Sequence, residues 1–233
     1  AAVLGAAAGF CRRVEHAQDT MRLLDQALAH IAAESSPAVL LISKDRQQAS
    51  VGARSERESM LTAPSVPRLS GAAIHAAARQ LVGGRCVIIA GEEVLRARAQ
   101  EELAQLSAAL DALVAVAPDA RDAFDNRDAR FIGVAGAMGH SRVTAALSAA
   151  GSCLVVGTRL PLLARMGLEA RLLDMPVVSL GREASFLTSD RHHHLACELR
   201  SGLRMLAGAI RDCGAKPRVE HHIAAGAVSP TGP

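Results

Sequence analysis

The residues of this sequence best suited to hold a phosphate group follow two apolar runs, 131–134 and 153–156. Glycine lets backbone N–H groups approach a phosphate closely, and an arginine guanidinium pairs with it. Ligands of parallel sheets bind outside the carboxyl ends of the strands. If the two runs are neighbouring parallel strands, the loops after them converge on one phosphate. We therefore predict a weak nucleotide-binding site formed by Gly136, Gly139, His140, Gly157 and Arg159.

A simpler interpretation of the same residues stays open. The chain has no full dinucleotide fingerprint, so Gly136 and Gly139 could serve only a tight turn between a strand and a helix. Arg159 could form a surface ion pair, and His140 could be solvated at the start of the helix.

Other groups of reactive residues predict no chemistry. The consecutive histidines 192–194 point to opposite faces of a strand, so they cannot all reach one metal ion. The five cysteines share no metal-ligand spacing. The sequence contains no Gly-x-Ser-x-Gly turn that would expose a nucleophilic serine. We predict neither a metal site nor a hydrolase.

Composition narrows the class of protein. The 233 residues carry a net charge of +3, and basic residues form no run with interleaved aromatics, which argues against nucleic-acid binding. No apolar run reaches the roughly 18 residues that span a bilayer, so no membrane is expected. An odd number of cysteines, two of them in apolar strands, is typical of a reduced, cytoplasmic protein.

Apolar strands alternate with helical periodicity from residue 70 onward. Continuous apolar runs are typical of parallel strands, which are buried on both faces. We predict an α/β fold: a parallel sheet of about six strands with helices on both faces. The expected strands are 86–90, 113–116, 131–134, 153–156, 177–180 and, with less support from the pattern, 193–196. The expected helices are 74–81, 95–110, 143–150, 162–173 and 199–210.

The part before residue 70 reads as the remnant of a second α/β domain. A helix at 21–31 leads to a strand at 39–42, and the residues before them supply no partner strand in this interpretation. The strand then needs partners from outside the chain. The predicted division is 1–48 for the end of one domain, 49–69 for a linker, 70–212 for a complete domain and 213–233 for a tail.

Four segments in a fixed order carry a resemblance to a known family. They are SPAVLLISKD at 36–45, CVIIAGEEV at 86–94, FIGVAGAMGHSRVTAALSAAGSCLVVGTRL at 131–160 and LACELRSGLRML at 195–206. Together they resemble the end of the pyrimidine-binding domain and the central domain of thiamine diphosphate-dependent enzymes, in particular the acetolactate synthase-like members.

The resemblance implies a parent enzyme that decarboxylates a 2-keto acid and joins the product to a second molecule. The family's catalytic glutamate and its Gly-Asp-Gly...Asn motif for magnesium and diphosphate are not in this sequence. The chain is therefore expected to be inactive alone, to bind neither thiamine diphosphate nor magnesium by itself, and to need the missing domains or a second subunit. The full-length form would be a homo-oligomer.

Flavin binding is doubtful on the same comparison. Glu92 and Glu93 stand where flavin-binding members of the family carry glycines, and a carboxylate at a strand end repels phosphate. We expect Glu92 to be the opposing charge. Two other interpretations stay open: a free-standing module that binds FAD or NAD, and an inactive truncated product.

Overall fold

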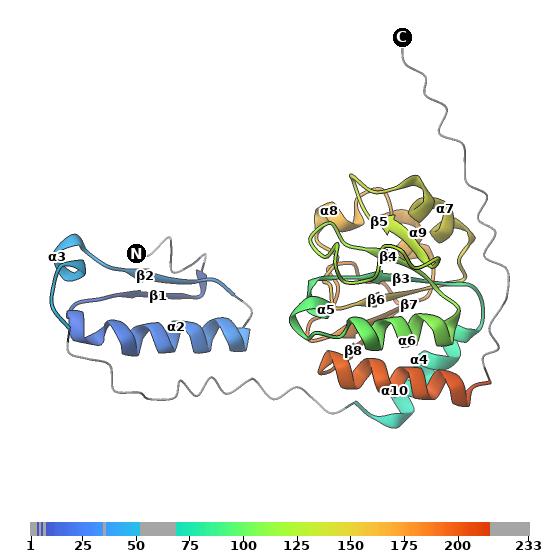
Figure 1. Ribbon diagram of the computed structural model, residues 1–233, viewed down its shortest axis with the longest axis horizontal. Coiled ribbons are helices and arrows are strands. Elements are labelled where there is room, and N and C mark those ends of the chain that lie inside the picture. The colour runs from blue at the N-terminus through green and yellow to red at the C-terminus, as the bar shows by residue number, and fades with distance from the viewer. Residues whose placement is uncertain (1–3, 5, 7, 35, 52–68, 215–233) are drawn as a thin grey trace, which may run out of the picture. The chain divides into compact units, whose positions relative to one another are not determined.

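The computed structural model describes residues 4, 6, 8–34, 36–51 and 69–214. The chain forms two compact units, unit 1 at Ala1–Ser65 and unit 2 at Val66–Pro233. Both are shown in Figure 1. Most of the predicted linker 49–69 and of the tail 213–233 lies outside the described residues.

Unit 2 is built on one six-stranded sheet in which every neighbouring pair is parallel. The order across the sheet is β5-β4-β3-β6-β7-β8. All five residues of each of the central strands β3, β6 and β7 are buried, which explains their continuous apolar sequences. The strands are β3 (Cys86–Ala90), β4 (Leu113–Val116), β5 (Phe131–Val134), β6 (Ser152–Val156), β7 (Val177–Gly181) and β8 (His192–Ala196). The predicted fold class is confirmed, including the strand near residue 193.

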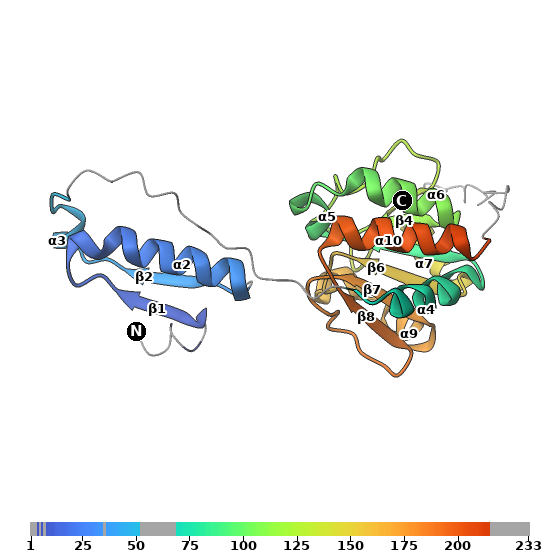
Figure 2. The ribbon, with the colours of Figure 1, turned by 90° about the horizontal axis from the view of Figure 1, so that it is seen from below.

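Helices cover both faces of this sheet. In Figures 1 and 2, α4, α6 and α10 lie along one face, and α7 and α9 lie on the other. Ser70 caps α4, because its hydroxyl accepts a hydrogen bond from the Ala73 N–H at 3.1 Å. The helices of unit 2 are α4 (Gly71–Val82), α5 (Glu92–Arg96), α6 (Gln100–Leu110), α7 (Ser141–Ala149), α8 (Leu162–Arg165), α9 (Glu169–Asp174) and α10 (Leu199–Asp212).

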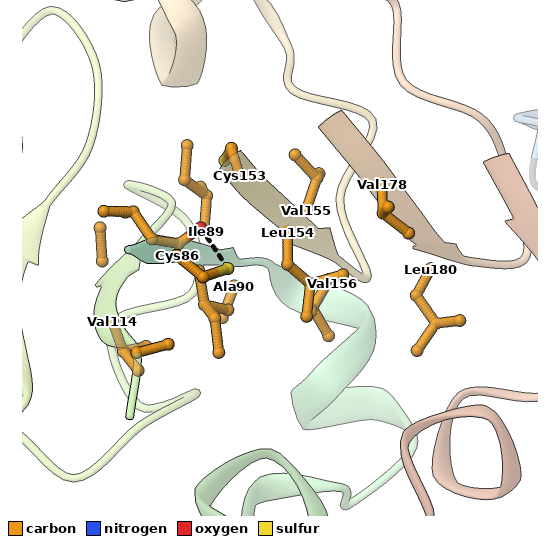
Figure 3. Packing of buried hydrophobic residues seen from close by; sticks show 14 of the residues in the cluster. Cys86, Ile89, Ala90, Val114, Cys153, Leu154, Val155, Val156, Val178 and Leu180 are labelled. Atoms are coloured by element: carbon orange, nitrogen blue, oxygen red, sulfur yellow. Dashed lines mark hydrogen bonds between the residues drawn. The ribbon is translucent and has the colours of Figure 1, made fainter. Parts of the chain in front are cut away.

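The core is made almost wholly of aliphatic side chains. Figure 3 shows these side chains extending from both faces of the central strands. Cys86 and Cys153 are fully enclosed among them and form no disulfide. Burial raises the pKa of the Cys86 thiol to about 12, so this cysteine behaves as a small hydrophobe.

Two predicted helices are each divided in the structure. The expected helix 95–110 is α5 followed by α6, because Arg98 takes a left-handed backbone conformation (φ 50°) between them. The expected helix 162–173 is α8 followed by α9, with Gly167 (φ 81°) at the break. Apolar periodicity continues across both breaks and hides the first of them, whereas Gly167 is the sequence signal for the second.

Unit 1 contains β1 (Phe10–Arg13), a short 3-10 helix η1 (Ala17–Asp19), α2 (Thr20–Glu34), β2 (Ala38–Leu41) and α3 (Lys44–Gln47). β1 pairs with β2 in parallel, in register from Phe10 opposite Ala38 to Arg13 opposite Leu41. The expectation that no partner strand precedes the helix is therefore wrong. The strand FCRR was missed because half of it is charged and exposed.

Candidate functional site

The direction in which successive strands are added to the sheet of unit 2 reverses between β3 and β6, and this place is called the switch point below. From β3 the chain runs outward through β4 to β5, then returns to place β6 on the other side of β3 and continues to β7 and β8. In open parallel sheets, ligands bind at this switch point, outside the carboxyl ends of the two strands. The first place to look for a site is therefore the pair of loops that begin at Gly91 and Gly157.

The structure corrects one premise of the predicted nucleotide site. β5 lies at the edge of the sheet and β6 near its centre, with β4 and β3 between them. The loops 136–140 and 157–159 thus do not follow neighbouring strands. Consecutive strands in sequence were assumed to pair, but the chain crosses two strands before it forms β6.

The glycines after β5 make a turn that contacts α8. Gly136 has φ 90°, and a Cβ there would collide with the carbonyl oxygen of Leu163. The next residue, Ala137, donates its N–H to that same oxygen at 3.0 Å. A Cβ at Gly139 would lie 2.6 Å from the Val134 carbonyl oxygen. These contacts account for both glycines without a ligand.

His140 closes the same turn. Its Nδ1 accepts a hydrogen bond from the Val134 N–H at 3.0 Å, and its ring covers Gly133, where a Cβ would lie 2.6 Å from the ring. His140 stands at the N-cap of α7, but its side chain makes no capping hydrogen bond. The ring therefore holds the turn against the end of β5.

Arg159 has two partners within its own part of the chain. Its Nη1 lies 2.6 Å from Glu183 Oε2, and its guanidinium lies 4.1 Å from the centre of the Phe186 ring. The Phe186 N–H also donates to the Arg159 carbonyl oxygen at 2.7 Å. Ion pairing and cation–π contact fix this half-exposed side chain against the loop after β7.

The switch point itself is occupied by side chains of the protein. A Cβ at Gly91 would collide with Thr158, so the loops after β3 and β6 are in direct contact. Glu93 N–H donates to the Gly157 carbonyl oxygen at 3.0 Å. The carboxylate of Glu93 then reaches the end of β7, where both of its oxygens accept from the Arg182 N–H at 3.2 and 3.1 Å.

Glu92, which is expected to oppose a ligand here, lies away from the end of β7, and Glu93 occupies that position. Glu92 Oε1 pairs with Arg96 at 2.8 Å on the half-exposed side of α5, whereas the next residue turns inward. Burial raises the pKa of Glu93, and the Arg182 N–H bond and the positive charges of Arg182 and Arg96 partly offset this rise. The sequence analysis predicts Glu92 as the opposing charge, and which of the two glutamates turns inward depends on the residue at which α5 begins.

The histidines of β8 contact different partners. Both ring nitrogens of His192 lie at backbone carbonyl oxygens, of Leu187 at 2.8 Å and Leu172 at 2.9 Å, while His194 Nδ1 lies 2.9 Å from Ser179 Oγ. In the part of the chain that the structure describes, no three His, Cys, Asp or Glu side chains gather as potential metal ligands. The described residues also include no helix long and apolar enough to cross a membrane.

Comparison with solved structures shows which proteins share this fold. A benzoylformate decarboxylase from Polynucleobacter necessarius superposes with a TM-score of 0.61 and 14% identity, over 85% of this chain and 38% of that one. A thiamine diphosphate-dependent 4-hydroxybenzoylformate decarboxylase from Rhodococcus jostii RHA1 gives a TM-score of 0.60 and 22% identity, over 91% and 40%. This chain thus spans about two fifths of the length of these structures.

Comparison at the level of sequence gives one clear match. No curated protein matches the chain. A family model described as the central domain of thiamine pyrophosphate enzymes matches residues 74–202, which is more than half of the chain and nearly all of the described part of unit 2. The chain therefore belongs to the thiamine pyrophosphate enzyme family and contains its central domain.

Proposed function

We propose that this chain is the structural middle of a thiamine diphosphate-dependent enzyme that decarboxylates a 2-keto acid and, as in acetolactate synthase, joins the product to a second molecule. Unit 1 would be the end of the pyrimidine-binding domain, and residues 70–212 the central domain. The family match of residues 74–202 carries the proposal. The two solved structures compared above are both decarboxylases of 2-keto acids, which supports the reaction class.

The poor burial of the strands in unit 1 supports its assignment to a larger domain. None of the residues of β1 or β2 is buried, although parallel strands normally have both faces covered. A two-stranded sheet with one helix has too small an apolar core to be stable alone. Additional strands and a covering layer, supplied by the rest of a pyrimidine-binding domain, would complete it.

The exposed side chains of α2 also support the assignment of unit 1 to a larger domain. Leu23 and Ala27 of α2 are buried. Leu24, Leu28 and Ile31 widen the same apolar face, and they remain 36–44% exposed. An apolar face that extends beyond the residues buried within unit 1 is expected if further parts of a larger domain cover it.

The described residues do not fit the cofactor of the parent family. Diphosphate bound through magnesium needs several oxygen ligands at one point, and no such group of acidic side chains exists among these residues. We therefore propose that thiamine diphosphate and magnesium are held by other domains or by a second subunit, and that the complete enzyme is a homo-oligomer. All five cysteines are free, which supports a cytoplasmic location.

The predicted nucleotide site stays a prediction. The contacts of Gly136, Gly139 and His140 support the alternative role, in which these residues shape a turn. Gly157 and Arg159 likewise have partners within the protein. These contacts do not favour the interpretation of the chain as a free-standing FAD or NAD module.

The proposal is tested by reading the coding sequence on both sides of this chain. We expect a Gly-Asp-Gly...Asn motif downstream and a glutamate-bearing segment upstream. The longer protein encoded by the whole reading frame, supplied with thiamine diphosphate and magnesium, should then release CO2 from a 2-keto acid such as pyruvate or benzoylformate. Residues 1–233 alone should release none. Absence of both segments from the flanking frames and from any co-purifying polypeptide would overturn the proposal.

A further inference from the structure

The switch point carries glycines of the kind that form anion sites, but a side chain of the protein lies against two of them. Three glycines end the strands around it: Gly91 after β3, Gly157 after β6 and Gly181 at the end of β7. Such glycines ordinarily let a phosphate come close to backbone N–H groups. In this chain the Glu93 carboxylate approaches them instead.

The distances show how closely Glu93 fills this space. A Cβ at Gly181 would lie 2.6 Å from Glu93 Oε2, and a Cβ at Gly157 would lie 2.8 Å from Glu93 Cβ. Both positions have positive φ, 155° and 60° respectively. Any side chain at Gly157 or Gly181 would therefore displace the glutamate, so these glycines are explained by a ligand that belongs to the chain itself.

The hydrogen bond between Glu93 and the backbone N–H of Arg182 is of the kind that phosphates form at strand ends. The backbone N–H of Arg182, the first residue after β7, donates to both oxygens of Glu93. The positive charges of Arg182 and Arg96 act on the same carboxylate, and Glu183 opposes them. One carboxylate thus links α5, which follows β3, to the carboxyl end of β7.

We propose that Glu93 is an internal anion: its carboxylate occupies the place of a nucleotide phosphate at the switch point, so this central domain is closed to FAD, NAD and ADP there. The inference is independent of the proposed enzymatic reaction, because it concerns only contacts within unit 2. It also gives the glycine-ended strands a structural purpose, which is to seat the glutamate that joins the two halves of the sheet.

Removal of the carboxylate should leave a space that a small anion fills. Glu93→Ala keeps the Cβ and removes a group with the size and charge of acetate. We expect Glu93→Ala to melt about 5 °C below the wild-type chain, because hydrogen bonds to a charged group are lost. Acetate at 10–100 mM should restore at least half of this difference, because it binds only the folded state.

The controls separate a specific site from a general salt effect. The carboxylate of Glu92 pairs with Arg96 on the half-exposed side of α5, so Glu92→Ala should melt close to wild type and show no response to acetate. Glu93→Gln, which keeps the space filled, should fold and show no response either. Sodium chloride at matched ionic strength should not replace acetate.

Equilibrium dialysis with ADP and with FAD completes the test, and neither should bind to the wild-type chain. An unchanged melting temperature for Glu93→Ala would overturn the proposal. So would an equal acetate effect on Glu92→Ala, or saturable binding of ADP or FAD to the wild-type chain. If Glu93→Ala is unfolded in chloride, recovery of its folded circular-dichroism spectrum in acetate supports the proposal, and failure to recover overturns it.

Discussion

Simultaneous replacement of Arg200 and Arg204 by alanine is expected to lower the free energy of unfolding, measured by urea denaturation as a fall in the midpoint concentration, because it leaves a buried carboxylate unpaired. These residues of α10 donate to one oxygen of Glu102, on α6: Arg200 Nε and Nη2 at 3.0 and 2.8 Å, and Arg204 Nη2 at 2.6 Å. The glutamate side chain is 4% exposed, so its charge depends on these partners. The arginines are 44% and 62% exposed, and water partly replaces them, which places the loss at the low end for a buried ion pair.

A third substitution distinguishes an unpaired charge from simple loss of contacts. Adding Glu102→Leu to the double variant should recover most of the lost stability, because an apolar residue of similar volume needs no partner. Arg211→Ala, at an exposed position in the last turn of the same helix, is the matched control and should change stability by less than about 0.5 kcal/mol. If the triple variant is no more stable than the double variant, the carboxylate is not the source of the loss.

The ion pairs between Glu102 and the two arginines also predict how the free energy of unfolding depends on pH. Hydrogen bonding from Arg200, opposed by burial and aided by Arg204, lowers the pKa of Glu102 below its ordinary value of 4.5. A carboxyl with a lowered pKa contributes stability that is fully present above its unfolded pKa and is lost as pH falls through its folded pKa. In the double variant the buried, unpaired carboxyl should have a raised pKa. Acidification toward pH 4.5 should then reduce the stability difference between the two proteins.

Gly136→Ala is expected to cost about 3 kcal/mol, which combines an unfavourable backbone conformation with a steric clash. The new Cβ would strike the Leu163 carbonyl oxygen, which belongs to the backbone of α8 and already accepts from Ala137. The turn after β5 and the start of α8 would have to separate. Chemical denaturation and the hydrogen-exchange rate of the Ala137 amide report this separation.

Gly167→Ala is the matched control for this substitution. Gly167 has a similar φ of 81°, but no atom lies within 4 Å of the Cβ position. Its substitution should cost only the backbone strain, about 1 kcal/mol. If the two variants lose equal stability, the contact between Gly136 and α8 is unimportant, and the glycine is free to serve a ligand.

The fold of unit 2 could be predicted because its strands carry their own signal. The runs at β3, β6 and β7 are almost wholly apolar, interrupted only by the buried Ser152 and Ser179, and such runs are typical of parallel strands that are covered on both faces. Strand β1 could not be found in this way. It is short, its last two residues are exposed arginines, and only pairing with β2 identifies it.

The candidate site was harder to predict because it depends on strand order. Sequence places the loop at Gly157 after a strand, but it does not reveal that β3 and β7 flank that strand. The choice between Glu92 and Glu93 depends on the residue at which α5 begins, and helix boundaries are the least certain part of a sequence pattern. Gly181 and Arg182 carry no signal of their own and gain meaning only from the carboxylate that they contact.

Calorimetric titration of residues 1–233 with thiamine diphosphate in the presence of magnesium tests the central claim most directly. The account predicts no saturable heat, because the chain contains the central domain of the family and its described residues hold no group of three or more His, Cys, Asp or Glu side chains that could bind a metal ion. The continuous protein that includes the other domains should bind under the same conditions. Saturable micromolar binding by residues 1–233 alone would contradict the account, because this chain would then hold the cofactor itself.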